Sequence, residues 1–284
     1  MMTTPKEILR TRGIRPRKRL GQSFLQDLNI ANKIIDFADI QPGETVVEIG
    51  AGLGVMTGLI AAKARRVIAV EIDPFMIDIL HERLQCFDNV DVVAMDVLKF
   101  DFFSVCSPDP SEKLKIVGNV PYHISSPILF RLLDFRKRIS SMILMLQKEV
   151  ADRIRALPGG KEYGIPSVMT AMFCTTQRLM DVPAGCFYPE PKVVSSILKI
   201  GVREKPVVDL QNEELFRKIV RLSFAKRRKT LLNNLRHASL PGYPAESMLS
   251  ALQDSGMDGM RRAETLSAME FGLLSNYIIS KEKA

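Results

Sequence analysis

Between residues 44 and 146 the sequence alternates short apolar runs with segments of helical spacing. The apolar runs have the length of strands, whereas the segments between them place apolar residues three and four positions apart. Such alternation predicts a mostly parallel sheet with helices on both faces, because parallel neighbours need a crossover connection. The strands expected here are residues 44–50, 66–72, 90–94, 113–118 and 142–146.

Two further strands and a change of composition follow. Residues 177–182 and 193–200 have the pattern of a hairpin that completes a seven-stranded sheet, so we expect a Rossmann-like α/β domain. From residue 206 onward the chain shows helical spacing, as at Leu215 and Ile219, and no convincing strand. The expected parts are a basic N-terminal arm over residues 1–20, the α/β domain over 21–203 and a small all-helical domain over 204–284.

The loop after the fourth of these strands reads Gly118-Asn119-Val120-Pro121-Tyr122. Pro121 cannot donate to a sheet, so the strand stops there and the loop lies at its carboxyl end, where open α/β sheets bind ligands. The Asn119 side-chain oxygen and the Val120 carbonyl can each accept one N–H of an exocyclic base amine, which localises the lone pair of a weak nucleophile. Tyr122 can stack on the base, and Pro121 stiffens the loop. The segment therefore predicts catalysis by positioning, although taken alone it also fits an ordinary strand-to-helix turn.

Three glycines, Gly50, Gly52 and Gly54, separate the first strand from its helix. Glycine permits positive φ and close approach of the backbone to a ligand. Glu71 ends the second strand about 20 residues later, where an acid can hold both hydroxyls of a ribose. Asp96 follows the third strand, where it can accept a hydrogen bond from an adenine amine. All these groups are expected at one edge of the sheet, together with the loop described above.

The glycine spacing separates classes of cofactor. A dinucleotide-binding turn has Gly-x-Gly-x-x-Gly, and a P-loop has Gly-Lys-Ser/Thr. This turn has Gly-x-Gly-x-Gly with Glu48 just before it. The pocket therefore suits a nucleoside without a pyrophosphate, and S-adenosylmethionine is the expected cofactor.

These motifs resemble those of the ribosomal RNA small-subunit adenine N6,N6-dimethyltransferases, and the resemblance covers nearly the whole chain. Ser23 stands where the family has Asn, so a cofactor contact there is safer if made by the backbone. Val120 stands where the family has Leu, which leaves the carbonyl available. The matching segments are residues 21–25, 48–54, 118–122, 147–151, 187–193, 224–231 and 233–235.

The resemblance implies a class I methyltransferase that acts during ribosome assembly. It would transfer methyl groups to N6 of two adjacent adenines near the 3′ end of small-subunit (16S-type) rRNA, two to each. The adenine must leave any stack to reach the pocket. By the resemblance Asn119 and Tyr122 would hold it, and Phe187 would pack against it. The residues that would contact the cofactor are Ser23, Leu25, Gly50, Glu71, Asp96 and Asn119, with Gly52 and Gly54 in the same turn.

A net charge of +8 and a pI near 9.3 favour a polyanionic partner. Two basic clusters contain no acid, and each is either a solvated segment or a site for the RNA backbone; we favour RNA because there are two of them. The candidate RNA contacts are Arg15, Arg17, Lys18 and Arg19 near the N-terminus, and Lys226, Arg227, Arg228 and Lys229 further along.

The cysteine spacing bears on metal binding and on the redox compartment. The four of them have neither metal-ligand nor disulfide-framework spacing, so we expect no metal and a reducing, cytoplasmic location. No uncharged apolar run reaches membrane-spanning length. By the resemblance, the expected partner is the rRNA of the small-subunit precursor (the pre-30S particle), and we expect a monomer to bind it.

Two alternatives stay open. A large-subunit rRNA adenine dimethylase of the macrolide-resistance type shares the catalytic motifs, although residues 227–231 and the Asn pair that follows favour the small-subunit type. A non-catalytic ribosome-assembly factor would keep the fold without needing its activity. The intact set Glu71, Asp96, Asn119 and Tyr122 argues against that factor.

Overall fold

The computed structural model describes residues 4–236 and 248–282. By its internal contacts the chain divides into two compact units. The first comprises Met1–Ala151 and Gln177–Val202, and the second Asp152–Thr176 and Arg203–Ala284. The second unit thus resumes at Arg203, beside the predicted domain boundary, and it also takes in a stretch that the predicted domains left within the α/β part.

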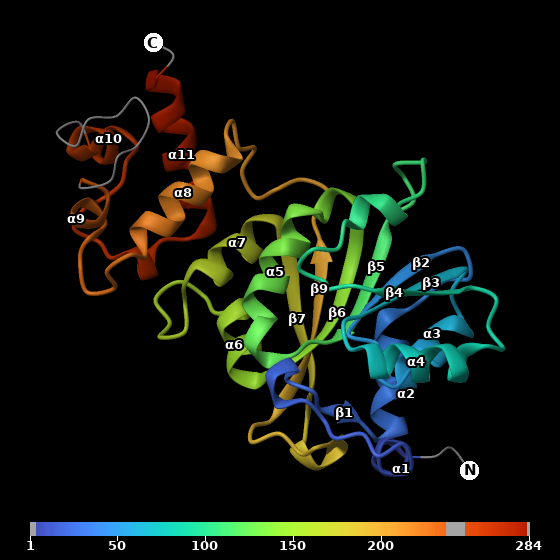
Figure 1. Ribbon diagram of the computed structural model, residues 1–284. Helices are drawn as coiled ribbons and strands as arrows, with labels where there is room; N and C mark the ends of the chain where they lie inside the picture. Colours follow the sequence, from blue (N-terminus) through green and yellow to red (C-terminus); the bar gives the residue numbers. More distant parts are fainter. Residues whose placement is uncertain (1–3, 237–247, 283–284) are drawn as a thin grey trace. The chain divides into compact units, whose positions relative to one another are not determined.

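Among the described residues, seven strands form one sheet in the order β4-β3-β2-β5-β6-β9-β7 (Figure 1). The pairs β2–β3, β3–β4, β2–β5 and β5–β6 are parallel, and β6–β9 is antiparallel. The prediction of a mostly parallel, seven-stranded sheet is therefore confirmed. The strands are β2 Thr45–Ile49, β3 Arg66–Glu71, β4 Val90–Ala94, β5 Leu114–Asn119, β6 Ile139–Gln147, β7 Cys174–Val182 and β9 Ser195–Val202.

The chain reverses its direction of travel across the sheet between β2 and β5. From β2 it moves outward to β3 and β4, and then returns to the other side of β2 as β5. Ile49 and Gly118 are partners in this pairing. A Cβ on Gly118 would lie 3.0 Å from the Ile49 Cβ, so the two strands need a glycine here. Reversals of this kind open a crevice at the carboxyl ends of the strands, where such sheets bind ligands.

Helices α2, α3, α4 and α5 of the first unit lie along the chain before, between and after the strands β2 to β5. Asp27 caps α2 by accepting hydrogen bonds from the Asn29 and Ile30 amides. Ile124 holds the cap position of α5, and the Ser125 hydroxyl donates back to the Tyr122 carbonyl at 3.1 Å. The helices are α2 Leu28–Ala38, α3 Val55–Ala61, α4 Pro74–Leu84 and α5 Ser125–Asp134, and α6 Lys148–Arg155 follows β6.

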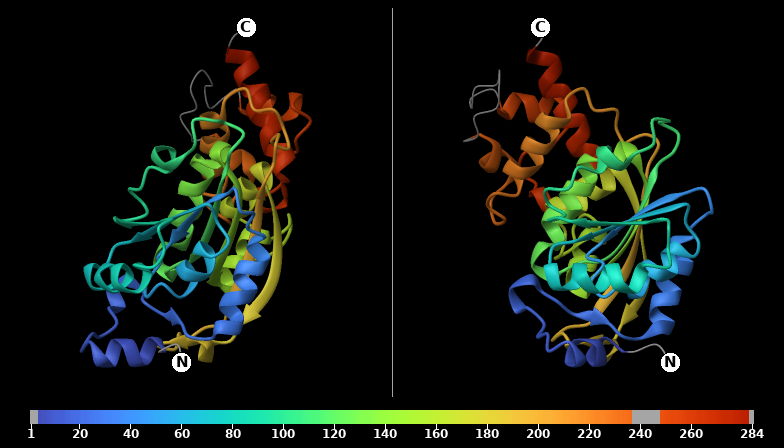
Figure 2. Two further views of the ribbon diagram at one scale, coloured as in Figure 1. Left: turned by 90° about the vertical axis from the view of Figure 1, so that its right-hand side faces the viewer. Right: turned by 45° about the vertical axis from the view of Figure 1, so that its right-hand side comes forward.

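The described part of the predicted N-terminal arm is folded. Helix α1, Pro5–Thr11, begins with a capping box between Thr4 and Glu7, and its Ile8 and Leu9 are buried with Phe24 and neighbouring apolar residues. Further along, β1 (Phe24–Leu25) pairs antiparallel with β8 (Phe187–Tyr188). Figure 2 shows both segments at the same end of this unit. The N-terminal segment is therefore part of the first unit's core, not a free tail.

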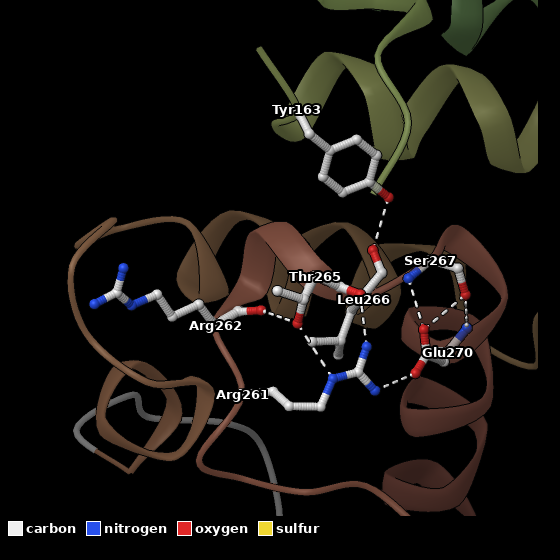
Figure 3. A network of polar contacts seen from close by, with 7 residues as sticks. All are labelled: Tyr163, Arg261, Arg262, Thr265, Leu266, Ser267 and Glu270. Atoms are coloured by element: carbon white, nitrogen blue, oxygen red, sulfur yellow. Dashed lines mark hydrogen bonds and ion pairs between the residues drawn. The ribbon is translucent and has the colours of Figure 1, made fainter. Parts of the chain in front are cut away.

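The second unit is helical from residue 204 onward, within the described part of the chain. Helix α7 packs on α8 and α11, and the rings of Phe173 and Phe216 meet edge to face with centroids 6.2 Å apart. The segment before α11 is tied down by polar contacts (Figure 3): the Tyr163 hydroxyl donates to the Leu266 carbonyl at 2.8 Å, and Arg261 pairs with Glu270. The helices are α7 Ile165–Phe173, α8 Glu213–Ser223, α9 Leu231–Leu235, α10 Met248–Asp254 and α11 Ala268–Glu282.

Candidate active site

A cavity of about 170 Å³ opens at the carboxyl ends of β2, β3, β4 and β5. Residues from five separate parts of the chain line it: 20–24, 49–52, 70–72, 95–98 and 119–124. The predicted site residues that line it are Ser23, Gly50, Gly52, Glu71, Asp96, Asn119, Val120, Pro121 and Tyr122.

Asn119 ends β5 with its side chain held in one orientation. Its amide nitrogen donates a hydrogen bond to the Ser23 carbonyl at 2.8 Å. The Val120 amide donates to the Met145 carbonyl at 3.0 Å, which anchors the start of the loop to β6. No described residue donates to the Asn119 side-chain oxygen or the Val120 carbonyl. Two acceptors are thus left available at the cavity.

Tyr122 begins the short 3₁₀ turn Tyr122–Ile124 that follows Pro121. Its hydroxyl lies 2.9 Å from the hydroxyl of Ser195, a fully buried residue at the start of β9. Burial raises the pKa of Tyr122, and the Ser195 hydrogen bond acts in the opposite direction. The phenol is therefore neutral near pH 7, so it can present a ring face to a base but cannot act as a general base.

The glycine turn and Glu71 form one hydrogen-bonded unit. Gly50 and Gly52 have φ of 70° and 56°, values that favour glycine. The Gly52 amide donates to one Glu71 carboxylate oxygen at 2.9 Å, and the Ile72 and Asp73 amides donate to the other at 2.8 Å each. Burial raises the pKa of Glu71, and these three amides oppose it. A carboxylate offers about four acceptor positions, so Glu71 keeps one for a sugar hydroxyl.

Asp96 and two apolar side chains also line the cavity. One Asp96 carboxylate oxygen accepts the Leu98 amide at 2.9 Å, which fixes the side chain and leaves its other oxygen for a ligand. Ile72 and Met95 line the same cavity although 47% and 41% of their surface is exposed. Exposed apolar groups beside a hydrogen-bonding carboxylate suit a flat heterocycle such as adenine. Sequence reasoning missed both residues; their place directly after a strand end is the signal that could have found them.

Three predicted site residues do not line this cavity. Leu25 and Phe187 are β1–β8 partners, only 4% and 2% exposed, and they pack in the apolar core. Gly54 is the N-cap of α3, with φ of 75°, and a Cβ there would lie 3.1 Å from Leu80. The cofactor roles of Leu25 and Gly54 and the adenine contact of Phe187 stay predictions. Ser23 does line the cavity, but its hydroxyl donates to the Pro189 carbonyl at 2.8 Å.

The buried Asp73 holds the segment before Ser23 against the first unit. It accepts hydrogen bonds from the Gln22 side chain at 2.7 Å and the Phe75 amide at 3.1 Å. It also pairs with Arg17 at 3.1 Å, and that guanidinium lies over the Phe75 ring at 4.8 Å. Arg17 is therefore engaged within the protein. The other predicted RNA contacts of this cluster, Arg15, Lys18 and Arg19, are exposed, and no described acidic group pairs with them.

The second basic cluster lies between α8 and α9. Arg227 bonds to Glu264 at 2.9 Å and to the Lys161 carbonyl. Asn234 holds the turn from within, because its side-chain amide donates to the Ser223 and Lys226 carbonyls at 2.7 and 3.2 Å. The predicted RNA contacts of this cluster that stay exposed without a described acidic partner are Lys226, Arg228 and Lys229.

The comparison with protein families agrees with this geometry. Residues 13–278 match the family described as ribosomal RNA adenine dimethylase. The chain belongs to that family. A Syntrophus aciditrophicus protein named "Ribosomal RNA small subunit methyltransferase A" is 47% identical over 97% of this chain and 98% of its own. A Bacillus mycoides protein of the same name is 42% identical over 96% and 95%.

Solved structures of adenine dimethylases and related enzymes have the same fold. A dimethyladenosine transferase from Plasmodium falciparum matches with a TM-score of 0.79 and 28% identity, over 91% of this chain and 98% of that one. The 23S rRNA methyltransferase ErmE matches with a TM-score of 0.66 and 27% identity, over 90% and 99%. As an adenine dimethylase, the chain is an S-adenosylmethionine-dependent methyltransferase of the class I fold.

Residues 4–236 and 248–282 contain neither a candidate metal site nor a candidate membrane-spanning helix. No group of three or more His, Cys, Asp and Glu side chains is placed to hold a metal ion there. Likewise, none of the helices described has the length and apolar character needed to cross a membrane.

Proposed function

We propose that this adenine dimethylase modifies N6 of two adjacent adenines near the 3′ end of small-subunit rRNA, giving N6,N6-dimethyladenosines. One observation carries the proposal. The Asn119 amide nitrogen is occupied by Ser23, so its oxygen and the Val120 carbonyl are two acceptors with no described donor, on two residues that line the cavity. Two adjacent acceptors match the two N–H bonds of an adenine amine.

The cavity residues fit S-adenosylmethionine, which when bound supplies a methyl group on a positively charged sulfur. Glu71 keeps an acceptor position for a ribose hydroxyl, and Asp96 keeps one for the adenine amine. Gly50 and Gly52 leave the backbone open to close approach. Ile72 and Met95 provide apolar walls. These residues would hold and orient the cofactor, and we assign none of them a proton-transfer role.

For the target base, the pair Asn119 and Val120 would draw the amine towards tetrahedral geometry and so localise its lone pair. Each methyl group gained at nitrogen displaces one proton, which water takes up after transfer. The monomethylated amine still has one N–H, so one of the two acceptors suffices for the second round. Tyr122 would stack on the base, with its ring fixed by Ser195.

The small subunit is preferred over the large subunit on the strength of the relatives. Proteins named small-subunit methyltransferase A are 42–47% identical over nearly the full length. The 23S rRNA methyltransferase ErmE is 27% identical over a similar span. The cavity residues do not separate these substrates, because both reactions need the same adenine chemistry.

We further propose that the chain acts as a cytoplasmic monomer on the pre-30S particle. The exposed basic residues support an rRNA partner, since each can neutralise a phosphate. They are Arg15, Lys18 and Arg19 in the first unit and Lys226, Arg228 and Lys229 in the second.

The test is to incubate the protein and radiolabelled S-adenosylmethionine with small subunits that lack the modification, and to map the label. We expect two neighbouring dimethyladenosines near the 3′ end of the rRNA. Purified large subunits are the parallel substrate, and Asn119→Ala is the inactive control. Label in large-subunit rRNA instead would support the alternative dimethylase. Cofactor binding without label in either subunit would support a non-catalytic assembly factor.

A further inference from the structure

Glu48 is a buried acid that the proposed reaction does not use. It is the fourth residue of β2, flanked by Ala69 of β3 and Val117 of β5. Its exposed fraction is 0%, and neither carboxylate oxygen has a hydrogen-bond partner among the described residues. An ionised carboxylate in such a place is very costly unless an opposite charge or donors compensate it.

A second, smaller cavity lies against Glu48. Its volume is about 30 Å³, enough for a water molecule. Phe24, Gly50, Gly52 and Asn119 line both this cavity and the larger one described above. The acid therefore lies directly behind the glycine turn and beside the residue that is proposed to hold the target amine.

The surroundings of Glu48 disfavour its charge. The pKa of Glu48 is raised to about 8: burial raises it most, the Thr57 hydroxyl of α3 acts in the opposite direction, and the negative charge of Glu71 at the end of β3 adds to the rise. From β1, Phe24 and Leu25 face the small cavity, as Val55 and Met56 do from α3, and all four are apolar. The flanking β3 and β5 residues are apolar too. No described cation acts on Glu48, so it is mostly protonated at neutral pH.

We propose that Glu48 selects the cationic methyl donor over its neutral product, by losing its proton when S-adenosylmethionine binds and keeping it when S-adenosylhomocysteine binds. This inference rests on the proposed use of the larger cavity for the cofactor. The two molecules differ by one methyl group and one positive charge on sulfur. A nearby positive charge favours the carboxylate form of an acid, whereas a neutral thioether does not. The released proton passes to solvent.

The proposal gives Glu48 a role in turnover. Four transfers on two adenines require three exchanges of product for donor on one particle. Once the methyl group leaves, the sulfur is neutral, and the buried carboxylate is left without its counter-charge. Glu48 then takes up a proton, and the affinity for the product falls relative to that for the donor. Glu48 is accordingly a residue that determines the specificity of the cofactor site. It is assigned no contact with the adenine amine that accepts the methyl group.

Calorimetric titration of the full chain tests this directly. Binding is measured at pH 7 in two buffers with different ionisation enthalpies, so that the difference gives the number of protons released. We expect S-adenosylmethionine to release most of one proton and S-adenosylhomocysteine to release none. Between about pH 6 and 8, the Kd for the donor should fall by up to about tenfold per pH unit, while that for the product stays level.

Glu48→Gln keeps the shape of the side chain and removes the ionisation. This variant should release no proton with either ligand, and its preference for donor over product should fall about tenfold. Glu112→Gln, which alters an exposed acid paired with Arg65, is the matched control and should keep the wild-type proton release. Donor binding by the wild type without proton release would overturn the inference about Glu48 alone. Absence of any donor binding would instead count against the proposed function.

Discussion

The side-chain nitrogen of Asn119 lies 2.8 Å from the backbone carbonyl of Ser23, a residue 96 positions earlier in the chain. This bond joins a segment that lines the proposed cofactor cavity to the residue that is proposed to hold the target amine. It also decides which atom of the amide faces the cavity, because a carbonyl can only accept. Disturbing it should therefore affect cofactor and substrate together.

The first prediction concerns Asn119→Asp, which replaces the donating nitrogen with an oxygen. That oxygen would face the Ser23 carbonyl oxygen, and two acceptors cannot share a hydrogen bond. The side chain must therefore turn, and the segment around Ser23 loses its hydrogen bond to residue 119. We expect turnover to fall at least about 100-fold and the Kd for S-adenosylmethionine to rise several-fold, which corresponds to about 1 kcal/mol for the lost hydrogen bond. Label transfer to small subunits and calorimetry measure the two effects. Asn32→Asp, at an exposed amide on α2, is the matched control and should change neither.

The second prediction separates the Tyr122 ring from its hydroxyl. Tyr122→Phe keeps the ring but loses the 2.9 Å bond to Ser195, and Ser195→Ala loses the same bond from the other side. Each should lower kcat about five-fold, the effect of one hydrogen bond of about 1 kcal/mol. The double variant should be no worse than either single one, since both remove one interaction. Tyr122→Ala should lower kcat far more. Additive losses in the double variant would show that Ser195 acts independently of Tyr122.

The third prediction follows from the raised pKa of Glu48, about 8 against an ordinary value of 4.5. Between these two values the unfolded chain releases a proton that the folded protein keeps, so this group makes the folded state less stable as pH rises. Glu48→Gln cannot ionise in either state. At pH 7.5 it should increase the free energy of unfolding by a few kcal/mol, on the order of the linkage expected for a shift of this size, and at pH 5 the gain should fall to about 1 kcal/mol.

Urea unfolding of both proteins at the two pH values measures that difference. Glu112→Gln serves as the control, because hydrogen bonding and charge from Arg65 lower the pKa of Glu112. A lowered pKa contributes stability above the ordinary pKa and loses it as pH falls, so this variant should show no gain at pH 7.5. If Glu48→Gln were equally stabilising at pH 5 and pH 7.5, packing and not ionisation would be the cause.

The fourth prediction contrasts two neighbouring arginines of the N-terminal segment. Arg17 pairs with the buried Asp73 and covers Phe75, so Arg17→Ala should lower the unfolding temperature and weaken cofactor binding. Arg15 is exposed, and Arg15→Ala should leave both unchanged while weakening rRNA binding. If Arg15 contacts a phosphate, the slope of log affinity against log salt should decrease by about one. Equal effects of the two variants on the unfolding temperature would refute this division of roles.

The strands along the chain and the polar residues at their ends followed from the sequence, because both depend on local patterns. Pro121 marks the end of β5, and Glu71 and Asp96 stand where β3 and β4 stop. The β1–β8 pairing did not follow, since Phe24 and Tyr188 are far apart in the chain and a two-residue strand has no periodicity to detect.

The contacts that sequence reasoning missed depend on where side chains turn after the chain has folded. Nothing near Asp73 in the sequence indicates that Arg17 and Gln22 both bond to it. Glu48 stands in an apolar strand, but its complete burial depends on what packs over β2 from β1 and α3. A binding role for Ile72 and Met95 could not be predicted without the cavity that they line.

The last prediction tests why the glycine turn requires glycine. At Gly52 the φ of 56° is unfavourable for other residues, and a Cβ would lie 3.2 Å from the Phe24 ring. Gly13 has φ of 65° with nothing within 4 Å of its Cβ position, and Gly43 has neither constraint. Substituting alanine at each position therefore separates backbone strain from crowding in three variants.

We expect Gly43→Ala to leave the free energy of unfolding nearly unchanged and Gly13→Ala to lower it by about 1 kcal/mol, the usual cost of a positive φ. Gly52→Ala should lower it by about 2 kcal/mol, because the Phe24 ring must also move. Since Phe24 belongs to the segment that lines the cavity, this variant alone should also raise the Kd for S-adenosylmethionine. Urea unfolding and calorimetry give both quantities. If Gly13→Ala and Gly52→Ala were equally destabilising, the Phe24 ring would move aside without a free-energy cost. If cofactor affinity were also unchanged, the close approach of Gly52 and Phe24 would have no part in binding.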